Sequence, residues 1–452
     1  MDLMEGKMAG TRSLVPISTR LHEIAELARR RPGEALTTLS HHIDEAFLRE
    51  AYQQTRKNGA VGIDNETGAE FSRMLPTRLK DLLGRFKSGQ YRAPPVRRVY
   101  IPKASGGVRP LGIPTFEDKV LQRAVAMVLG AVYEQEFLPC SHGFRPGRSA
   151  HTALSALREH LTELRGGWVL EVDIRSFFDT IDHQRLQEIL ARRVRDGVLH
   201  RIIGKWLNAG VMEGATWKHA ATGTPQGGVI SPLLANVYLH EVLDQWFERV
   251  VKAHLKGRAY LVRYADDFVM VFENYRDACR VWKVLPKRFG KYGLELHPEK
   301  TRLVRFRRPP LNAGPKGRSQ LGPRPQTFDF LGFTVHWGRN IRRWWVVMYR
   351  TAKTRLRRAI KSVWEWCRRW RHLPLDQQHK KLVPKVRGHF NYFGIPGNGR
   401  QVHRLYSAVR WSWRYWLDRR SQRRSMAWPR YLKLLKRLPL PFPKLRPLPK
   451  HA

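Results

Sequence analysis

The chain has 452 residues and a formal net charge of +45, because 83 lysines and arginines outnumber 38 aspartates and glutamates. This length is sufficient for two or three domains, each with a hydrophobic core. The charge indicates a polyanionic partner: nucleic acid is the first candidate and an anionic membrane surface the second.

Membrane-spanning and secreted classes are not supported. No apolar run approaches the roughly 18–20 residues that a transmembrane helix needs. The N-terminal sequence MDLMEGKMAG carries acidic residues and lacks the apolar core of a signal peptide. The three cysteines are far apart and form no CxxC pair, so neither a disulfide framework nor a zinc finger is indicated. A reducing cytosol fits, and we expect a cytoplasmic protein of the bacterial cytosol or nucleoid with no membrane partner.

The positive charge is concentrated near the C-terminus. Residues 339–452 hold 31 lysines and arginines but only three acids, a net charge of +28, together with nine of the 15 tryptophans. Such a segment is either a nucleic-acid surface, in which aromatic rings stack on bases, or an amphipathic helical domain with tryptophans in its core. The first interpretation is favoured, because a surface that faces only solvent normally mixes both signs of charge.

The N-terminal part of the chain is predicted to be mainly helical, with one hairpin. Residues 1–45 are expected to be helical, and a helix over 41–59 ends at Gly59, before the glycine-rich loop GAVGIDNET. Residues 94–114 predict a β-hairpin with its turn at 103–107, followed by a helix over 116–137.

The middle of the chain alternates helices and strands. Ser149 is a candidate N-cap for a helix with leucines at helical spacing, and WVLEVDI at 168–174 predicts a strand. A further helix begins with Ser231 as the N-cap and Pro232 at its first position.

The C-terminal part is predicted to contain a loop, a helical region and a tail. The Pro/Gly/Arg-rich residues 307–327 predict a loop, and residues 341–420 are expected to be mostly helical. The proline-rich end LPLPFPKLRPLPK is expected to be extended and mobile.

Two adjacent aspartates interrupt an otherwise apolar strand pattern in AYLVRYADDFVMVF. A hairpin turn, a buried ion pair or a metal site could each explain Asp266 and Asp267 at this position. Asp173 ends another apolar strand, and if the two strands are neighbours, three carboxylates converge at one sheet edge. Such oxygen ligands select Mg²⁺ or Mn²⁺. Two such ions about 3.5–4 Å apart can hold the attacking and leaving oxygens of phosphoryl transfer.

A series of motifs in order then resembles the group II intron-encoded reverse transcriptase/maturase family over roughly residues 50–420. The segments that carry the resemblance are YIPKASGGVRPLGIP, CSHGFRPGRSAHTAL, VLEVDIRSFFDTIDH, GTPQGGVISPLLANVYLHEVLD, VRYADDFVMVF, GLELHPEKT, FDFLGF and, at residues 386–398, VRGHFNYFGIPGN. Residues 386–398, here the maturase-like segment, are similar to the maturase or thumb motif of that family.

The resemblance implies an α+β fold, a right-hand polymerase with an antiparallel palm sheet followed by an α-helical thumb. It implies an N-terminal extension over 1–45, fingers over 46–167, a palm over 168–335, a thumb/maturase domain over 336–420 and a basic proline-rich tail over 421–452. Many members of the family continue into a cysteine-bearing endonuclease domain. Because CxxC pairs are absent, we expect no endonuclease.

The same resemblance implies roles for individual residues. Asp173, Asp266 and Asp267 would be catalytic and hold two Mg²⁺ ions, with Mn²⁺ as the alternative, and the backbone of Ile174 would assist. The deoxynucleoside triphosphate would be bound by Lys103, Arg109, Phe178, Gln226, Gly227 and Lys300. Phe178, or its neighbour Phe177, would exclude a 2′-hydroxyl. RNA would be contacted by Arg145 and, in and beside the maturase-like segment, by Arg387, Phe390, Tyr392, Phe393 and Arg400.

Simpler structural interpretations remain open for several of these residues. Lys103 and Arg109 could belong to an exposed basic hairpin, Phe178 could be core packing, and Lys300 could be a surface lysine. Among polymerases, Tyr264 before Ala265 and an aromatic residue in the first acidic block are typical of enzymes that make DNA rather than RNA.

The resemblance implies an RNA-directed DNA polymerase and intron maturase. It would bind its intron RNA, assist splicing and reverse transcribe the RNA for retrohoming, with an RNA template, a DNA primer and target DNA as partners. The alternative is a host-adopted reverse transcriptase in a defence or CRISPR-associated role without splicing activity. A splicing factor with a decayed polymerase is disfavoured, because the acidic residues and Gln226 are intact.

Overall fold

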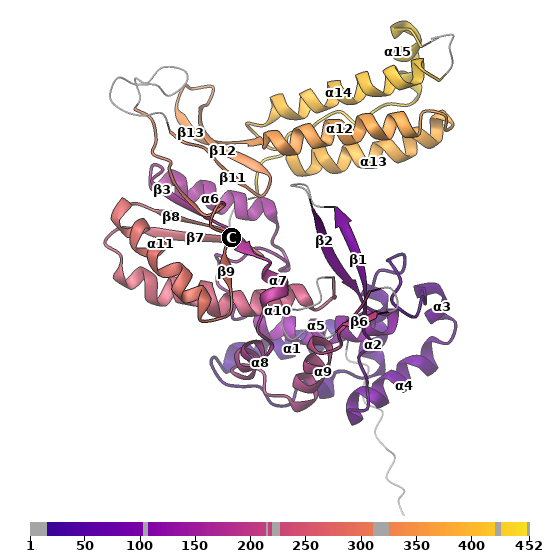
Figure 1. Cartoon of the computed structure of the whole chain (residues 1–452), viewed down its shortest axis with the longest axis vertical. Coiled ribbons are helices and arrows are strands. Elements are labelled where there is room, and N and C mark those ends of the chain that lie inside the picture. Colours follow the sequence, from indigo (N-terminus) through magenta and orange to yellow (C-terminus); the bar gives the residue numbers. More distant parts are fainter. Residues whose placement is uncertain are drawn as a thin grey trace, which may run out of the picture. The chain divides into compact units, whose positions relative to one another are not determined.

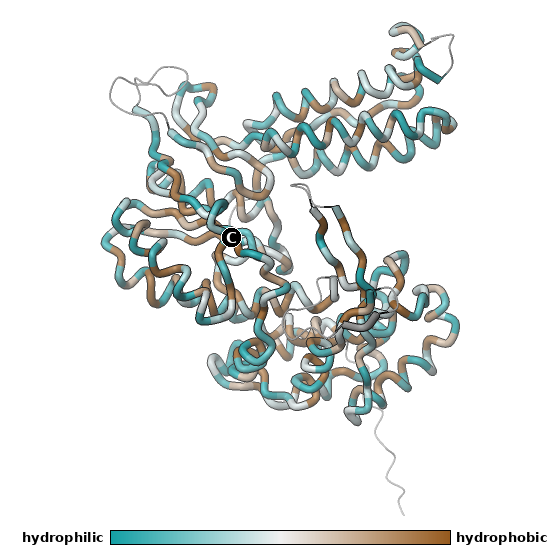
Figure 2. Tube along the Cα trace, viewed as in Figure 1, coloured by the Kyte–Doolittle hydropathy of each residue, from teal (hydrophilic) through white to brown (hydrophobic). Residues whose placement is uncertain are grey.

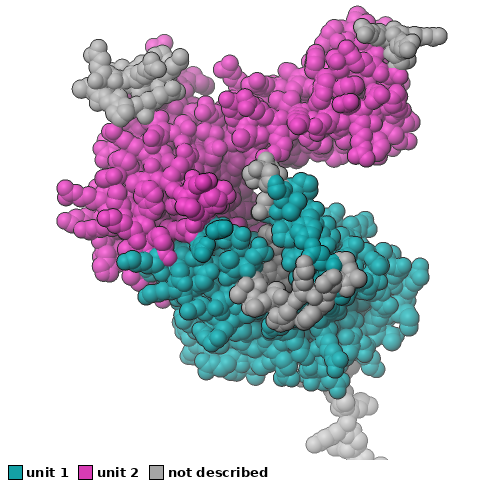
Figure 3. All heavy atoms as spheres, viewed as in Figure 1, with its two compact units in different colours: residues 1–139, 174–246, 287–295 teal, residues 140–173, 247–286, 296–452 magenta. Residues whose placement is uncertain are grey.

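The computed structural model describes residues 16–102, 107–213, 216–218, 227–310, 325–420 and 426–449, with only the backbone of 216–218. The chain divides into two compact units, neither of which is continuous in sequence (Figure 3). The first unit comprises residues 1–139, 174–246 and 287–295. The second unit comprises residues 140–173, 247–286 and 296–452.

The first unit is mainly helical and carries one small sheet. In this sheet the order is β2-β1-β5-β6, and β1 (Val96–Pro102) pairs antiparallel with β2 (Val108–Ile113). This pairing confirms the predicted hairpin. The other strands are β4 (Ile174–Arg175), β5 (Val211–Glu213) and β6 (Thr216–Lys218). The helices are α1 (Ile17–Arg30), α2 (Glu45–Gln54), α3 (Gly68–Ser72), α4 (Leu75–Ser88), α5 (Phe116–Tyr133), α7 (Phe177–Thr180), α8 (His183–Ala191), α9 (Gly197–Leu207) and α10 (Ser231–Leu239), and α10 continues as the π-helix η2 (His240–Gln245).

The second unit is built around a four-stranded antiparallel sheet with the order β10-β3-β8-β7. The apolar run that contains the two aspartates supplies the neighbouring strands β7 and β8, as the pattern predicts. Helix α6 packs on β7. The strands of this part are β3 (Trp168–Val172), β7 (Ala259–Tyr264), β8 (Asp267–Phe272), β9 (Glu295–Leu296) and β10 (Arg302–Arg305). The helices are α6 (Ala150–Glu163), η3 (Phe247–Val251), η4 (Lys252–His254) and α11 (Tyr275–Gly290). Strand β9 and helix α11 each have residues in both units.

A second sheet follows in the same unit, formed by β11 (Phe328–Phe330), β12 (Phe333–Arg339) and β13 (Trp345–Thr351). The prediction that residues 341–420 are mostly helical is therefore wrong for β13. Its buried and less buried residues alternate with a period of two, and it pairs along its length with β12. Cross-strand pairing decides the conformation of this β-branched and aromatic stretch.

The C-terminal helices α12 (Lys353–Arg369), α13 (Leu375–Phe393) and α14 (Gly399–Asp418) lie side by side, and α15 (Trp428–Arg437) follows them (Figure 1). Hydrophobic and hydrophilic residues alternate along these helices, as amphipathic packing requires (Figure 2). Within the described ranges, no helix is long and apolar enough to span a bilayer.

One hydrophobic cluster runs through the second unit, from α6 and the four-stranded sheet through β11–β13 to the C-terminal helices. The expected boundary between the palm and the thumb, at residues 335 and 336, falls inside β12. The shared core therefore includes residues on both sides of this expected boundary.

The expected mobile tail is instead packed against the helices. Leu440 and Leu448 are buried, and the backbone N–H of Arg446 donates to the carbonyl of Gly394 at 2.7 Å. The segment is extended as predicted, because its prolines cannot continue α15. Leu440 and Leu448 pack this segment on the protein, whereas Phe442 and Leu445 are exposed.

The helix starts were predicted with mixed success. Ser149 caps α6 by accepting from the backbone N–H of Thr152, as predicted. Ser231 is not the N-cap of α10, because the helix already includes it and Ile230 takes the cap position without a side-chain bond. The predicted helix over 41–59 is shorter, since α2 covers only Glu45–Gln54 and the side chain of Asp44 caps it.

Candidate active site

The three aspartates are brought together by strand register within the second unit. Strands β3 and β8 are antiparallel, with Val172 opposite Phe268. Asp173 directly follows Val172 and Asp267 directly precedes Phe268, so both lie at the same end of the sheet. Asp266 occupies the tight turn between β7 and β8. The backbone thus places all three residues at one sheet edge, where the sequence predicted them.

The side chain of Asp173 is held by a lysine. Its Oδ2 accepts from Nζ of Lys300 at 2.6 Å, and its backbone carbonyl accepts from the N–H of His297 at 2.8 Å. Among the residues that the structure describes, no three His, Cys, Asp or Glu side chains are gathered closely enough to share a metal ion. The backbone register therefore suits a metal site with oxygen ligands. To bind a metal ion, the carboxylate of Asp173 would first have to release Lys300.

The turn that carries Asp266 is supported by a buried arginine. Ala265 has a φ of +56°, a left-handed conformation that is costly for a residue with a Cβ. The guanidinium of Arg263, which is 0% exposed, donates to the carbonyl of Ala265 at 3.1 Å and to Oγ of Ser141 at 2.8 Å. Arg263 thereby ties the turn to the preceding loop. Arg263 was not predicted from sequence as part of this site, although an arginine inside an apolar strand is itself a signal.

The loop at residues 140–145 packs closely on the same turn. A Cβ added at Gly143 would lie 2.4 Å from the backbone nitrogen of Ala265, so only glycine fits there. Arg145 was predicted to touch RNA, but it is 7% exposed and donates to the carbonyl of Ser141 at 2.9 Å. We correct that prediction: Arg145 shapes the loop, and its buried guanidinium is not a surface for RNA.

Several of the predicted nucleotide-binding residues lie in the first unit. Arg109 is exposed on β2, opposite Ile101 of β1. Lys103 and Gln226 lie outside the described residues. Gly227 has a φ of +123°, and a Cβ there would come within 2.6 Å of the carbonyl oxygen of Gly112. The glycine is thus required for the close approach of its loop to β2.

A buried carboxylate in α5 is connected to the same loop. Asp118, 1% exposed, accepts hydrogen bonds from the hydroxyl of Tyr91 (3.0 Å), Nε1 of Trp206 (2.5 Å) and Nε2 of Gln122 (3.0 Å). Gln122 accepts in turn from the backbone N–H of Val229 at 2.8 Å. Burial raises the pKa of Asp118 to about 7, against the effect of the three donors. This polar network was not predicted from sequence.

The two adjacent phenylalanines differ in exposure. Phe177 is 2% exposed and belongs to the core, whereas Phe178 is only half-buried, with the rings 5.2 Å apart. Ile174, which follows Asp173, begins β4 and buries its side chain. Of the two candidates for the residue that excludes a 2′-hydroxyl, Phe178 is therefore the one with an accessible ring.

The predicted RNA contacts of the maturase-like segment divide into buried and exposed residues. Phe390 and Phe393 are 5% and 9% exposed, so a base cannot stack on them, and we correct that prediction. Tyr392 is half-buried, and its hydroxyl donates to the carbonyl of Leu331 at 2.8 Å. Arg387 and Arg400 are exposed, so of the predicted contacts these two are the most accessible to RNA.

The same segment joins several elements of the second unit. Asn398 is 0% exposed; its Oδ1 accepts from the backbone N–H of Thr351 at 2.8 Å, and its Nδ2 donates to Oγ1 of Thr351 and to the carbonyl of Phe393. The tail segment bonds to Gly394 beside it. The motif therefore connects β13, α13, α14 and the tail.

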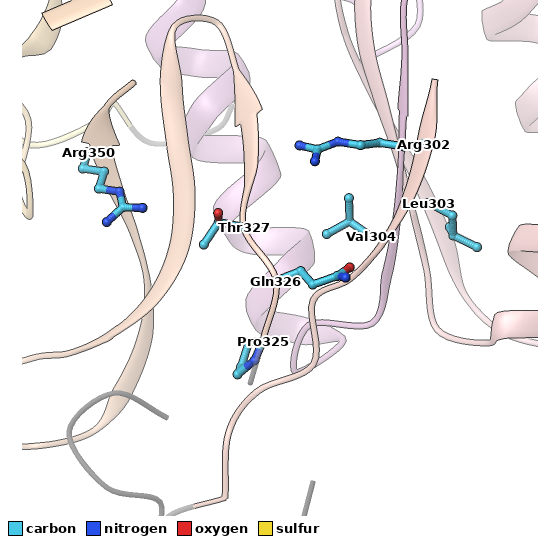
Figure 4. Close-up of a pocket in the computed structure, with 7 residues that line it drawn as sticks. All are labelled: Arg302, Leu303, Val304, Pro325, Gln326, Thr327 and Arg350. Atoms are coloured by element: carbon cyan, nitrogen blue, oxygen red, sulfur yellow. The ribbon is translucent and has the colours of Figure 1, made fainter. Parts of the chain in front are cut away.

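A pocket of about 510 Å³ lies beside β10 in the second unit (Figure 4). The guanidinium of Arg302 is held by Glu171 of β3, whereas the guanidinium of Arg350 of β13 has no hydrogen bond or ion pair to any described residue. The pocket is basic and open, and it contains none of the three aspartates. The residues that line it are Arg302, Leu303, Val304, Pro325, Gln326, Thr327 and Arg350.

Comparison with known proteins gives the same family as the motifs. Residues 101–335 match the family described as "Reverse transcriptase (RNA-dependent DNA polymerase)". Protein YkfC of Escherichia coli is 35% identical over 277 residues, which cover 54% of this chain and 71% of that protein. The group II intron-encoded protein LtrA of Lactococcus lactis is 33% identical over 358 residues, which cover 65% of this chain and 59% of LtrA. An uncharacterized 91 kDa protein in the cob intron of Schizosaccharomyces pombe is 35% identical over 237 residues, 51% of this chain and 29% of that protein.

The matched family covers more than half of the chain, and it includes the strands and the turn that carry Asp173, Asp266 and Asp267. The mixed helix and sheet architecture is consistent with this assignment. Members of this family generally use divalent metal ions, and the similarity to intron-encoded proteins agrees with the group II intron type. The chain belongs to the reverse transcriptase family of RNA-dependent DNA polymerases.

Proposed function

We propose that this protein copies RNA into DNA at the sheet edge that carries Asp173, Asp266 and Asp267, and that it also assists the splicing of a group II intron RNA. The observation that carries the polymerase proposal is the register of β3 and β8, which brings Asp173 and Asp267 to one end of the sheet. Carboxylates that gather at one end of a sheet would repel each other unless cations neutralise them.

The three aspartates would hold two Mg²⁺ ions, with Mn²⁺ as the alternative, and the backbone of Ile174 would assist. When bound, such ions activate the attacking oxygen and stabilise the leaving oxygen of phosphoryl transfer. The protein itself must hold these carboxylates in place. Arg263 and Gly143 serve this task, because one fixes the carbonyl of the turn and the other permits close packing.

Further residues are proposed to act on the deoxynucleoside triphosphate. Arg109, together with Lys103 and the loop of Gln226 and Gly227, would bind it, and the ring of Phe178 would exclude a 2′-hydroxyl. Once Lys300 is released from Asp173, its ammonium group would bind or protonate the leaving pyrophosphate. The half-buried ring of Phe178 and the exposed guanidinium of Arg109 support these roles.

The partners we propose are an intron RNA, an RNA template with a DNA primer, and target DNA. The similarity to the group II intron-encoded protein and the charge of +28 in residues 339–452 support an intron RNA. Exposed Arg387 and Arg400, beside the buried motif, are the proposed RNA contacts of that segment. Reverse transcription of the intron RNA would then serve its retrohoming.

The polymerase proposal is tested by primer extension on an RNA template with deoxynucleotides and Mg²⁺. Asp266→Asn keeps the size of the side chain but removes its charge, and we expect extension to fall by at least about 100-fold. Glu248→Gln, on η3, removes one charge outside the carboxylate edge and should extend normally. Normal extension by purified, folded Asp266→Asn would overturn the assignment.

A further inference from the structure

We propose that an aromatic surface on α12 and α14 binds unpaired bases of RNA by stacking. The surface consists of Trp364 on α12 and Trp411, Tyr415 and Trp416 on α14, and we call it the aromatic surface. The inference rests on the proposed RNA-binding function, which it makes specific by naming the chemistry recognised.

The four rings are in mutual contact. The rings of Trp364 and Trp411 are nearly parallel, with centroids 5.3 Å apart and an interplanar angle of 14°. Tyr415 lies 4.7 Å from Trp364 and 5.1 Å from Trp411, and Trp416 lies 5.0 Å from Trp364. Trp411 is 47% exposed and the other three rings are half-buried. The cluster therefore lies where α12 and α14 pack together, and Trp411 is its most exposed ring.

The core of the second unit is built from other residues of α14, although Trp416 packs against its edge. Helix α14 buries a different tryptophan, Trp413, which is 0% exposed and donates to Oε1 of Gln378 on α13 at 2.9 Å. Leu405, Val409 and Leu417 share the core with it. Trp411 lies on the opposite side of α14 from Trp413 and is 47% exposed, so its ring is available to a partner, whereas Trp416 packs against the edge of the core.

Arginine side chains lie beside these rings, and their positive charge favours an anionic partner. The guanidinium carbon of Arg419 lies 3.5 Å from the ring centroid of Tyr415, and those of Arg368 and Arg371 each lie 5.9 Å from that of Trp416. The acids nearby are already engaged: Glu365 pairs with Lys361, and Asp418 accepts from the backbone N–H of Met426.

A polyanion with flat groups fits this surface, whereas a second copy of the chain does not, since two such surfaces would repel. Stacking on aromatic rings is worth about 1–3 kcal/mol per base in single-stranded nucleic acids. In an A-form duplex the bases stack on one another and their faces are not accessible. The aromatic surface should therefore prefer unpaired RNA.

The buried state of Phe390 and Phe393 strengthens the assignment. Those rings, which the sequence marked for base stacking, are enclosed in the core. The stacking chemistry that the tryptophan-rich C-terminal region predicts is available on the outside of α12 and α14 instead.

The test compares the full-length protein and variants by fluorescence anisotropy with two labelled probes. One is a mixed-sequence 20-nucleotide single-stranded RNA, and the other is a 20-base-pair RNA duplex. We expect Trp411→Ala to weaken binding to the single strand about tenfold, as the loss of one stacked base requires, with less than a twofold effect on the duplex. Trp411→Tyr should restore most of the loss. Trp344→Ala is the matched control, because Trp344 is 58% exposed in the same basic region but outside the aromatic surface.

Two further measurements separate stacking from charge and from misfolding. Arg419→Gln should reduce the slope of affinity against salt by about one ion, whereas Trp411→Ala should leave the slope unchanged. Thermal midpoints of both variants should stay near that of the wild type. Ultraviolet crosslinking to RNA that contains 4-thiouridine should yield a peptide that includes Trp411 or Tyr415.

Equal losses on both probes, an equal loss in Trp344→Ala, or crosslinks confined to other peptides would each overturn the inference. These outcomes are separate from failure of the proposed function. A wild-type protein that extends primers but shows no preference for unpaired RNA would refute only the aromatic surface. A wild-type protein that neither extends primers nor binds RNA would refute the proposed function.

Discussion

Nζ of Lys300 lies 2.6 Å from Oδ2 of Asp173, the carboxylate that ends β3. The lysine ammonium lies where a metal ion would be expected. The pair is partly exposed, with side-chain exposures of 59% for Lys300 and 33% for Asp173. An ion pair of this kind is worth about 0.2–1 kcal/mol, so a divalent ion can displace the lysine.

This relationship predicts competition between Lys300 and Mg²⁺. Lys300→Gln should lower the Mg²⁺ concentration for half-maximal primer extension about two- to fivefold, the equivalent of the ion pair lost. Lys300→Arg keeps the charge and should retain the wild-type Mg²⁺ dependence. If Lys300→Gln needs as much Mg²⁺ as the wild type, the pair with Asp173 has no role in metal entry.

The exposure difference between Phe177 and Phe178 predicts different effects of the same substitution. Phe178→Val should raise ribonucleotide incorporation relative to deoxynucleotide incorporation about 10- to 100-fold, since the missing ring leaves room for a 2′-hydroxyl. Phe177→Val should instead lower the thermal midpoint, because it removes a core side chain. The measurement is the ratio of kcat/KM for the two nucleotide types. Unchanged selectivity in Phe178→Val would assign that ring to packing.

Asn398 should be structural, although it lies in the maturase-like segment. Asn398→Ala leaves the buried N–H of Thr351 without its partner, and we expect a loss of about 2–4 kcal/mol in unfolding free energy. Splicing assistance and primer extension should then fall together. A double variant of Arg387→Gln and Arg400→Gln should keep the thermal midpoint but weaken binding to the intron RNA, most strongly at low salt. Loss of splicing alone in Asn398→Ala would contradict its structural role.

The buried carboxylate of Asp118 predicts a pH-dependent stability. Its pKa is raised from the ordinary 3.8 to about 7, so the folded protein keeps the proton over a range in which the unfolded chain has lost it. The stabilising contribution is complete below the unfolded pKa and is lost as pH rises toward 7. Relative to Asp118→Asn, the wild type should lose about 2–3 kcal/mol between pH 5 and pH 7, with little further change above.

The measurement for Asp118 is the difference in thermal midpoint between the two proteins at each pH. Asp81→Asn, which removes an exposed carboxylate that pairs with Arg85, serves as the control. A difference that stays constant from pH 5 to pH 8 would show that Asp118 is ionised throughout.

The sequence alone determined the strands and the turn that carry the three aspartates. The apolar runs around Asp173 and around Asp266 and Asp267 have the composition of buried strands, and the cost of carboxylates in such a place already indicates a site. The hairpin of β1 and β2 and the cap at Ser149 follow equally from local residue preferences. These features depend on neighbours in the chain, which the sequence displays directly.

Only the tertiary structure decided which side chains face outward and which partners they take. Trp411 and Trp413 are two residues apart on α14, so they point in directions about 200° apart, and either could have been the core residue. The packing of α13 selects Trp413 and leaves Trp411 exposed. In the same way Phe390 is enclosed, Arg263 reaches Ser141, and Lys300 reaches Asp173. The physical reason is that burial and pairing depend on contacts between residues far apart in the chain, which local periodicity does not specify.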